Sequence, residues 1–195
     1  MLKELVLRNR SYRSYDETRE IKREELMDLV EHARLCASSV NQQPLKYYLA
    51  YTKEDINKIQ PLTGWAKALH KELPYAGHYP QAFIVICQDL NIAPNLQAYL
   101  KDVGIVAQTM LLRAVEMQLG GCMLGNFNPT EISDVLQLNE NLFPQLLLAV
   151  GKPDETIILE DVKLGENILY YRDENDVHHV PKRSLDELLI ANKDS

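Results

Sequence analysis

Two stretches decide the fold: Ala82-Phe-Ile-Val-Ile-Cys87 and, a few residues on, Leu96-Gln-Ala-Tyr-Leu-Lys-Asp-Val-Gly-Ile-Val-Ala-Gln-Thr-Met-Leu-Leu-Arg-Ala-Val-Glu-Met-Gln-Leu119. The first is short, continuous and rich in branched apolar residues, which predicts a central strand covered on both faces. In the second, apolar or small residues recur every three or four positions, which predicts a long buried helix. Gly104 and Ala107 are small enough to admit a neighbouring helix, so we expect this helix also to lie in a dimer interface.

The flanking sequence adds shorter elements. Upstream, the pattern predicts a helix over 23–36, a strand over 46–51 and helical segments over 54–59 and 65–72. Downstream, Gly120-Gly121 is expected to stop the long helix, before a strand over 122–124 and a helix over 129–136 begun by a proline. A strand over 145–150, a hairpin over 169–180 and a helix over 185–191 capped by Ser184 complete the chain.

This arrangement favours an α+β fold. The helices differ in length, no regular βαβ rhythm appears, and the G-x-G-x-x-G phosphate fingerprint of dinucleotide-binding domains is absent. The length of 195 residues and the absence of a linker or repeat predict one domain over residues 1–195.

Composition narrows the classes of function. The net charge of −7 argues against a nucleic-acid binder, because phosphate backbones are held by surplus Lys and Arg. The sequence shows no signal peptide and no membrane-spanning run. Cys36, Cys87 and Cys122 lie far apart without metal or disulfide spacing, so we expect a cytoplasmic protein.

Three polar or glycine-rich segments are candidates for ligand binding. Arg8-Asn-Arg-Ser-Tyr-Arg-Ser-Tyr15 gathers three guanidinium groups and four hydroxyls, a set that suits a phosphomonoester or a solvated basic surface equally well. Ser38-Ser-Val-Asn-Gln-Gln-Pro44 offers neutral donors and acceptors, although such a motif is more often an ordinary polar turn. Gly120-Gly-Cys-Met-Leu-Gly-Asn-Phe127 lets a backbone pass close to a flat ligand, or is only a turn around a strand.

A fourth segment and the remaining reactive side chains have simpler readings. Pro181-Lys-Arg183 can add charge to a phosphate site, although a basic pair before a helix is usually surface. His178 and His179 point to opposite faces of a strand, so we expect no metal site. Cys122 lies in an apolar strand without a base, which indicates a core thiol and not a nucleophile.

In this order and spacing, the four segments resemble the nitroreductase family of FMN-dependent flavoproteins over nearly the whole chain. Residues 9–15 are similar to the family's Arg-Ser-x-Arg-x-aromatic signature, with Asn9 where a second Arg is frequent. Residues 38–44 and 120–127 resemble its second and third motifs, and Lys182-Arg183 resembles its basic phosphate contact. The resemblance implies a central mixed or antiparallel sheet flanked by helices, a long buried core helix and a homodimer with FMN at the subunit interface.

The resemblance also assigns roles to residues. Arg10, Ser11, Lys182 and Arg183 are expected to hold the phosphate and ribityl chain, and Arg13 to lie near N1 and O2 of the flavin, where a cation stabilises the reduced form. The partner subunit is expected to supply the serine motif. Backbone groups of the third motif are expected beside the ring, with an N–H near N5. The full set of implied cofactor-binding residues is Arg10, Ser11, Arg13, Ser38, Ser39, Asn41, Gln43, Leu124, Gly125, Asn126, Lys182 and Arg183.

The implied activity is that of an FMN-dependent NAD(P)H oxidoreductase that reduces nitroaromatics, quinones or similar acceptors by a ping-pong mechanism. Flavin N5 carries the hydride, so no catalytic side chain is required. Two alternatives stay open: a specialised flavoenzyme of the same fold, such as a dehalogenase or heterocycle dehydrogenase, and a flavin-binding dimer without turnover. The choices between NADH and NADPH and among acceptors also stay open, because a pocket that binds by stacking leaves few specific polar contacts.

Overall fold

The computed structural model describes residues 1–190, which form two compact units. The first unit contains Met1–Trp65 and Glu72–Asp154, and the second contains Ala66–Lys71 and the described chain from Glu155 onward. The expectation of one domain over residues 1–195 stays a prediction.

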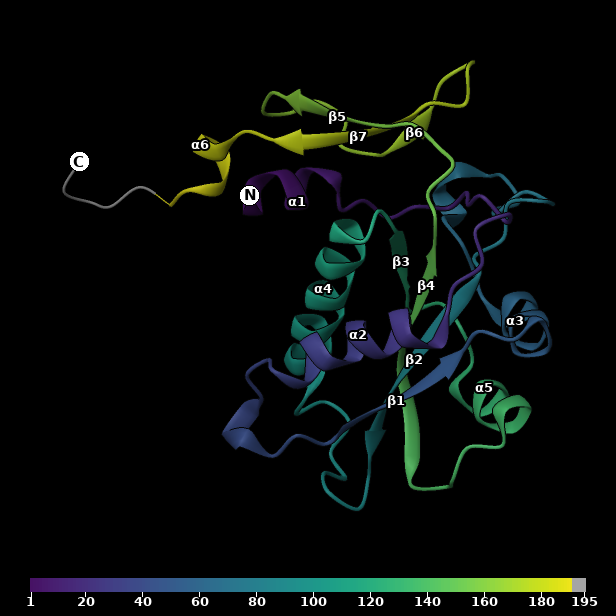
Figure 1. Ribbon diagram of the computed structural model, residues 1–195. Helices are drawn as coiled ribbons and strands as arrows, with labels where there is room; N and C mark the ends of the chain where they lie inside the picture. Colours follow the sequence, from purple (N-terminus) through teal and green to yellow (C-terminus); the bar gives the residue numbers. More distant parts are fainter. Residues whose placement is uncertain (191–195) are drawn as a thin grey trace. The chain divides into compact units, whose positions relative to one another are not determined.

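A four-stranded sheet forms the centre of the first unit (Figure 1). Its strands are β1 (Leu45–Ala50), β2 (Ala82–Asp89), β3 (Gly120–Leu124) and β4 (Leu142–Gly151), in the order β1-β2-β4-β3. Every neighbouring pair is antiparallel. All but the last residue of β2 are buried, which confirms the expected central strand.

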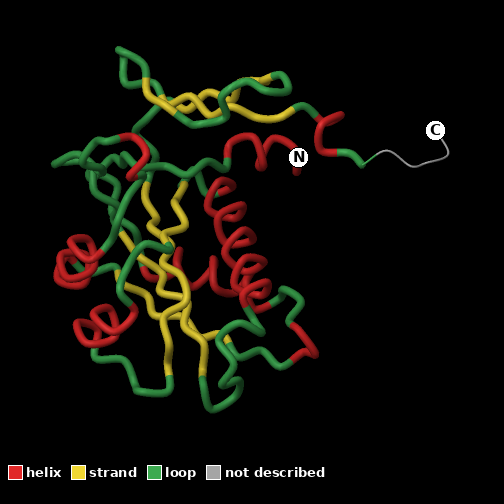
Figure 2. Tube along the Cα trace, turned by 180° about the vertical axis from the view of Figure 1, so that it is seen from behind, coloured by secondary structure: helices red, strands yellow, loops and turns green. Residues whose placement is uncertain are grey.

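Helices cover both faces of this sheet (Figures 1 and 2). On one face, α2 (Arg23–Arg34) and α4 (Leu100–Glu116) share a core with alternate residues of β2 and β4. On the other lie α3 (Lys53–Ile59) and α5 (Pro129–Leu136), whose Ile59 and Ile132 are fully buried. The short helix α1 (Leu2–Arg8), which the sequence analysis did not anticipate, buries none of its residues. The α+β fold and the long core helix are therefore confirmed.

Two local expectations were wrong. The long helix ends at Glu116, and the chain turns at Gln118 with a left-handed φ of 60°, so the two glycines that follow lie inside β3 and do not stop the helix. The segment over 65–72 contains only the 3-10 turn η3 (Lys67–Leu69). Ala107 is fully buried in the core that α4 shares with α2, so it admits a helix of its own chain, whereas Gly104 is exposed and the expected dimer interface stays a prediction.

The second unit is built on a three-stranded sheet of β5 (Ile157–Val162), β6 (Tyr171–Arg172) and β7 (His178–Arg183), in the order β5-β7-β6. The antiparallel β6 and β7 confirm the predicted hairpin, while β5, parallel to β7, was not anticipated. Ser184 caps α6 (Leu185–Leu188) by accepting a hydrogen bond from the Glu187 N–H. The expected helix end at Ala191 lies outside the described residues.

No helix within residues 1–190 combines the length and the apolar character needed to cross a lipid bilayer.

Candidate functional site

The arginine-rich segment lies against β3. Ser11 forms a parallel bridge with Gly121, and the Tyr12 N–H donates to the Gly121 carbonyl at 3.1 Å. A Cβ atom on Gly120 would stand 2.5 Å from a Tyr12 ring carbon, and one on Gly121 would stand 2.3 Å from the carbonyl oxygen of Ala149. The two glycines are therefore required so that the N-terminal segment and β4 can both approach β3.

Tyr15 fixes the end of this segment. Its side chain is fully buried, and its hydroxyl donates to the Tyr12 carbonyl at 2.7 Å. Its backbone N–H donates to the His78 carbonyl at 3.1 Å, and it forms an antiparallel bridge with Pro153. These contacts anchor residues 10–15 to the sheet and to the 75–80 loop.

Arg10 combines burial with an unsatisfied donor. Its guanidinium is half-buried and donates through Nη2 to the Val6 carbonyl at 2.6 Å. Its Nε is buried and has no hydrogen-bond partner among residues 1–190. Burial lowers the pKa of Arg10, yet an arginine with such a high ordinary pKa stays charged. A half-buried cation whose buried N–H has no acceptor is suited to bind an anion.

Arg13 follows three residues later on the same segment. It is half-buried, and its Nη1 donates to the Ser11 carbonyl at 3.1 Å. This bond folds the guanidinium back over the segment that contacts Gly121. Arg10, Ser11 and Arg13 therefore lie on the segment that contacts β3, and their role in cofactor binding stays a prediction.

The far end of β3 leaves open space. Leu124 is buried, whereas Gly125 and Asn126 are exposed. A Cβ atom on Gly125 would meet no heavy atom within 4 Å, and the Asn126 carbonyl accepts a 2.7 Å hydrogen bond from the Gly64 N–H. A flat ligand could therefore lie along this backbone without a steric barrier at Gly125.

The serine motif is organised by a buried carboxylate, Asp102, near the start of α4. The Ser38 hydroxyl donates to its Oδ2 at 2.7 Å, and Ser39 donates from its hydroxyl to Oδ1 at 2.8 Å and from its N–H to Oδ2 at 2.9 Å. Burial alone would raise the pKa of Asp102, but the donors from Ser38 and Ser39 outweigh it and hold that pKa below its ordinary value.

The sequence analysis did not select Asp102. The available signal was an acidic residue directly before Val103, on the face of the helix that otherwise carries apolar residues. Because a buried carboxylate requires donors, this position pointed to a polar partner elsewhere in the chain. Only the fold shows that the partner is the serine motif.

The rest of the motif forms a strained turn, η1 (Ser39–Asn41). Val40, Asn41 and Gln43 have left-handed φ values of 47°, 54° and 53°. The Gln43 N–H donates to Ser38 Oγ at 3.1 Å and its Nε2 donates to Asn41 Oδ1 at 3.0 Å. A branched residue such as Val40, 89% exposed, rarely adopts this conformation, and such strain is typical of functional loops.

The serine motif and the arginine segment lie toward opposite ends of α4. Asp102 is in the first turn of this 17-residue helix, and β3, which carries Gly121, begins four residues after its last residue. A helix of this length spans about 25 Å. One chain therefore presents the two predicted halves of the site at separate places.

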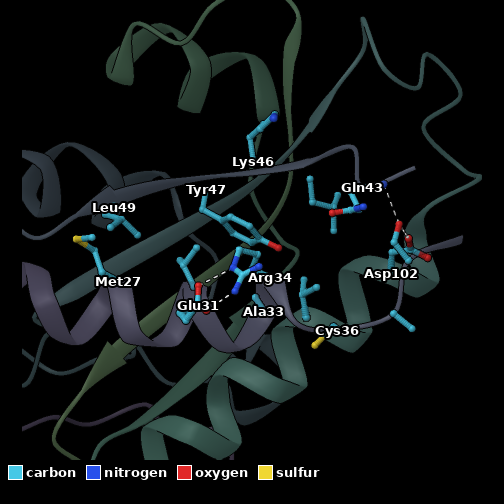
Figure 3. A pocket seen from close by; sticks show the side chains of 15 residues that line it. Met27, Glu31, Ala33, Arg34, Cys36, Gln43, Lys46, Tyr47, Leu49 and Asp102 are labelled. Carbon is cyan, nitrogen blue, oxygen red and sulfur yellow. Dashed lines mark hydrogen bonds and ion pairs between the residues drawn. The ribbon is translucent and has the colours of Figure 1, made fainter. Parts of the chain in front are cut away.

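A hollow of about 460 Å³ lies between α2 and β1 and ends at the serine motif (Figure 3). Apolar residues such as Met27 and Leu49 line one part of it, and Gln43 and Asp102 line another. Burial raises the pKa of Tyr47 in its wall to about 12, so this phenol stays neutral. The hollow includes none of the arginine segment and none of residues 124–126, so it is distinct from the candidate site at β3.

The remaining expected residues, Lys182 and Arg183, lie on β7 in the second unit. Both are exposed, and Arg183 Nη1 is 3.9 Å from Glu187 Oε2. On the same strand, His178 is buried and His179 is half-buried, as alternation predicts. Within residues 1–190, no group of three His, Cys, Asp or Glu side chains is arranged to hold a metal ion.

Solved structures share this fold. A nitroreductase family protein from Clostridium difficile 630 is 26% identical and superposes with a TM-score of 0.62 over 80% of this chain and 85% of its own. An FMN-dependent nitroreductase from Clostridium difficile R20291 is 21% identical, with a TM-score of 0.64 over 77% of this chain and 87% of its own. The chain is therefore an α+β protein with the nitroreductase fold.

Sequence comparison gives the family itself. The model of the nitroreductase family matches residues 6–152, and the chain belongs to this family. A Bacillus subtilis (strain 168) relative, FMN reductase [NAD(P)H], is 28% identical over 158 residues, which cover 74% of this chain and 63% of the relative. The family match ends at residue 152, just before Glu155, where the C-terminal part of the second unit begins.

Proposed function

We propose that this protein is an FMN-dependent oxidoreductase that takes electrons from NAD(P)H and reduces nitroaromatics, quinones or similar acceptors. The observation that carries the proposal is the half-buried Arg10, whose Nε lacks a partner among the described residues. Its segment contacts β3, the strand that the open Gly125 follows. The family match and the names of the relatives point to the same cofactor.

The residues at β3 suit FMN. A phosphate supplies the acceptor that Arg10 Nε lacks, and Ser11 adds a hydroxyl beside it. The space beside Gly125 suits a flat ring, with the backbone of Leu124 and Asn126 on either side. Lys182 and Arg183 would add positive charge at the phosphate end, and Ser38, Ser39, Asn41 and Gln43 would contact the cofactor from a second chain.

The chemistry that FMN supplies when bound is two-electron transfer through its N5 atom, from NAD(P)H and then to an acceptor, in a ping-pong sequence. The residues of this chain would bind the cofactor and orient its ring. Arg13 would place a positive charge where the reduced ring gains negative charge, and backbone N–H groups at the end of β3 would donate hydrogen bonds to the ring edge. No side chain is required as a general acid or base.

We also propose a homodimer, which the separation of the two halves supports. The serine motif and the arginine segment lie toward opposite ends of α4, so a second copy can bring the missing half to each site. Apolar side chains are available for such contact: Leu2, Val6 and Leu7 of α1 and Ile105 of α4 are all at least 43% exposed. Sedimentation analysis at micromolar concentration should give twice the chain mass.

We also propose a cytoplasmic location, supported by three cysteines that form no disulfide within residues 1–190.

The test is the visible spectrum of the purified protein during anaerobic titration with NADH and, separately, NADPH. Flavin bands that bleach and return on addition of a nitroaromatic or quinone support the oxidoreductase, and the more effective nucleotide identifies the preferred donor. Bands that neither nucleotide bleaches would indicate a flavin-binding protein without turnover. A colourless protein that does not take up FMN would refute the proposal.

Two glycine variants of β3 locate the cofactor. Gly125→Ala adds a methyl group where no protein atom lies within 4 Å, so it should keep the fold and lower FMN affinity, because the ring would lose that space. Gly121→Ala is the contrast, since its Cβ would collide with the Ala149 carbonyl and should destabilise the fold by about 3 kcal/mol. Unchanged FMN affinity in Gly125→Ala would place the cofactor elsewhere.

A further inference from the structure

Gly64 lies directly against the end of β3. It follows the 3-10 turn η2 (Gln60–Leu62), and its N–H donates to the Asn126 carbonyl at 2.7 Å. A Cβ atom on Gly64 would stand 1.7 Å from Asn126 Nδ2, 2.6 Å from Asn126 Cγ and 3.2 Å from the Asn126 carbonyl oxygen. Its φ is outside the left-handed region, so the backbone would accept alanine and only space is lacking.

Gly64 cannot move away from Asn126, because its neighbours in the chain, Thr63 and Trp65, are held in place. The Thr63 hydroxyl donates to the Gln60 carbonyl at 2.7 Å and accepts from Trp65 Nε1 at 2.8 Å. Trp65 is only 6% exposed, and its ring packs edge-on against Tyr15 at 6.5 Å between centroids. A larger residue at position 64 would therefore turn the Asn126 side chain away and press on the Asn126 carbonyl oxygen, while its own turn stays in place.

Asn126 is the part that can move. It lies between Leu124, which is buried in β3, and Asn128, whose side chain caps α5 by accepting from the Thr130 N–H at 3.0 Å. Gly125 separates Leu124 from Asn126 and provides the flexible link. The exposed amide side chain of Asn126 can rotate away from a Cβ atom at position 64, whereas its carbonyl oxygen, 3.2 Å from that Cβ and bonded to the Gly64 N–H, can shift only with the peptide after it, to which Gly125 gives freedom.

The contact also joins two parts of the site. Trp65 packs on Tyr15, and the Tyr15 hydroxyl holds the Tyr12 carbonyl, so the turn that carries Gly64 touches both the arginine segment and the end of β3. Residues 63–65 therefore contact both parts, which are also joined through β3.

From these contacts we infer that Gly64 is a positioning residue that fixes the Gly125–Asn126 backbone at the ring end of the cofactor site. The inference rests on the proposed FMN function. The absence of a side chain at position 64 lets the Asn126 carbonyl and amide lie where the ring edge is bound, and the 2.7 Å hydrogen bond keeps them there.

The experiment compares four proteins: wild type, Gly64→Ala, Asn126→Ala and the double variant. FMN affinity is measured by fluorescence quenching on the apoprotein, and the visible spectrum and midpoint potential are measured at saturating FMN. Gly64→Ala should raise the FMN dissociation constant about tenfold or more and shift the spectrum and potential of the bound flavin. Removal of Nδ2 and Cγ by Asn126→Ala should relieve the collision, so the double variant should match Asn126→Ala within about threefold.

Each outcome decides the inference. A Gly64→Ala protein that binds FMN as wild type does, with the same spectrum, overturns it, and so does a double variant that loses affinity by the full factor of the single one. A merely structural role would lower affinity without changing the spectrum or potential of the saturated protein, which also contradicts it. If Gly64→Ala does not fold, recovery in the double variant supports the inference and continued misfolding refutes it. Failure of the wild type to bind FMN refutes the proposed function itself.

Discussion

The substitution Asp102→Asn should weaken the hydrogen bonds that hold the serine motif on α4. The Asp102 carboxylate is 3% exposed and accepts three hydrogen bonds from Ser38 and Ser39. An amide offers one acceptor oxygen and turns an NH2 group toward a serine donor, so one or two charge-assisted bonds are lost. At about 1.5–3 kcal/mol for a hydrogen bond to a charged group, and with partial rotation of the hydroxyls, the free energy of unfolding should fall by about 2–4 kcal/mol.

The pH dependence gives a second measure of the same carboxylate. The folded-state pKa of Asp102 lies below its ordinary value, so its contribution to stability is complete above the unfolded-state pKa, about 3.9. It is lost as pH falls through the folded-state value. The stability difference between wild type and Asp102→Asn should therefore be largest near neutral pH and narrow below about pH 4.

Urea unfolding monitored by circular dichroism at several pH values measures both effects. Asp134→Asn is the matched control, because Asp134 is an exposed carboxylate on α5 and its replacement should change stability by less than about 0.5 kcal/mol. The reasoning is refuted if Asp102→Asn is as stable as this control at pH 7. A difference that does not narrow in acid would show that the lost energy does not come from the carboxylate.

Three further predictions concern other buried or coupled groups. Burial raises the pKa of Cys87 to about 12. Iodoacetamide at pH 8 should therefore leave this thiol unmodified in the native protein and modify it in urea, which mass spectrometry can measure. Labelling of Cys87 in the native protein would contradict its burial. His179 Nδ1 lies 2.5 Å from Glu160 Oε1, and this hydrogen bond raises the pKa of His179 above 6.5. The contribution of the pair to stability is therefore complete below pH 6.5 and is lost as pH rises through the folded-state pKa. The melting-temperature difference between wild type and His179→Gln should shrink from pH 6 to pH 9, and a constant difference would refute the pairing. Arg172→Met should destabilise the second unit by about 3–5 kcal/mol, because the buried Glu155 carboxylate loses the guanidinium that pairs with it. Proteolysis after residue 155 should therefore become faster. The double variant Arg172→Met, Glu155→Leu should recover resistance to proteolysis, and equal sensitivity of the single and double variants would argue against the ion pair.

Local pattern was enough for the main elements of the first unit. The helix over 129–136 has the predicted bounds, and the strand over 46–51 is displaced by one residue, because its signals are carried by neighbouring residues. Long-range effects account for the errors. Gly120 and Gly121 read as a helix stop, but Tyr12 and Ala149, distant in sequence, require them inside a strand. The strand β5 was missed because its pairing partner lies about twenty residues downstream.

The sequence by itself determined the α+β class, the central apolar strand, the long core helix and, through four motifs in register, the nitroreductase family. These depend on periodicity and on motif order, which are properties of the chain alone. Only the tertiary structure decided that Asp102 holds Ser38 and Ser39, that Gly64 meets Asn126, and that the two halves of the candidate site lie toward opposite ends of one helix. The physical reason is that a hydrogen bond or a steric contact between residues about sixty positions apart leaves no mark on the local pattern of either segment.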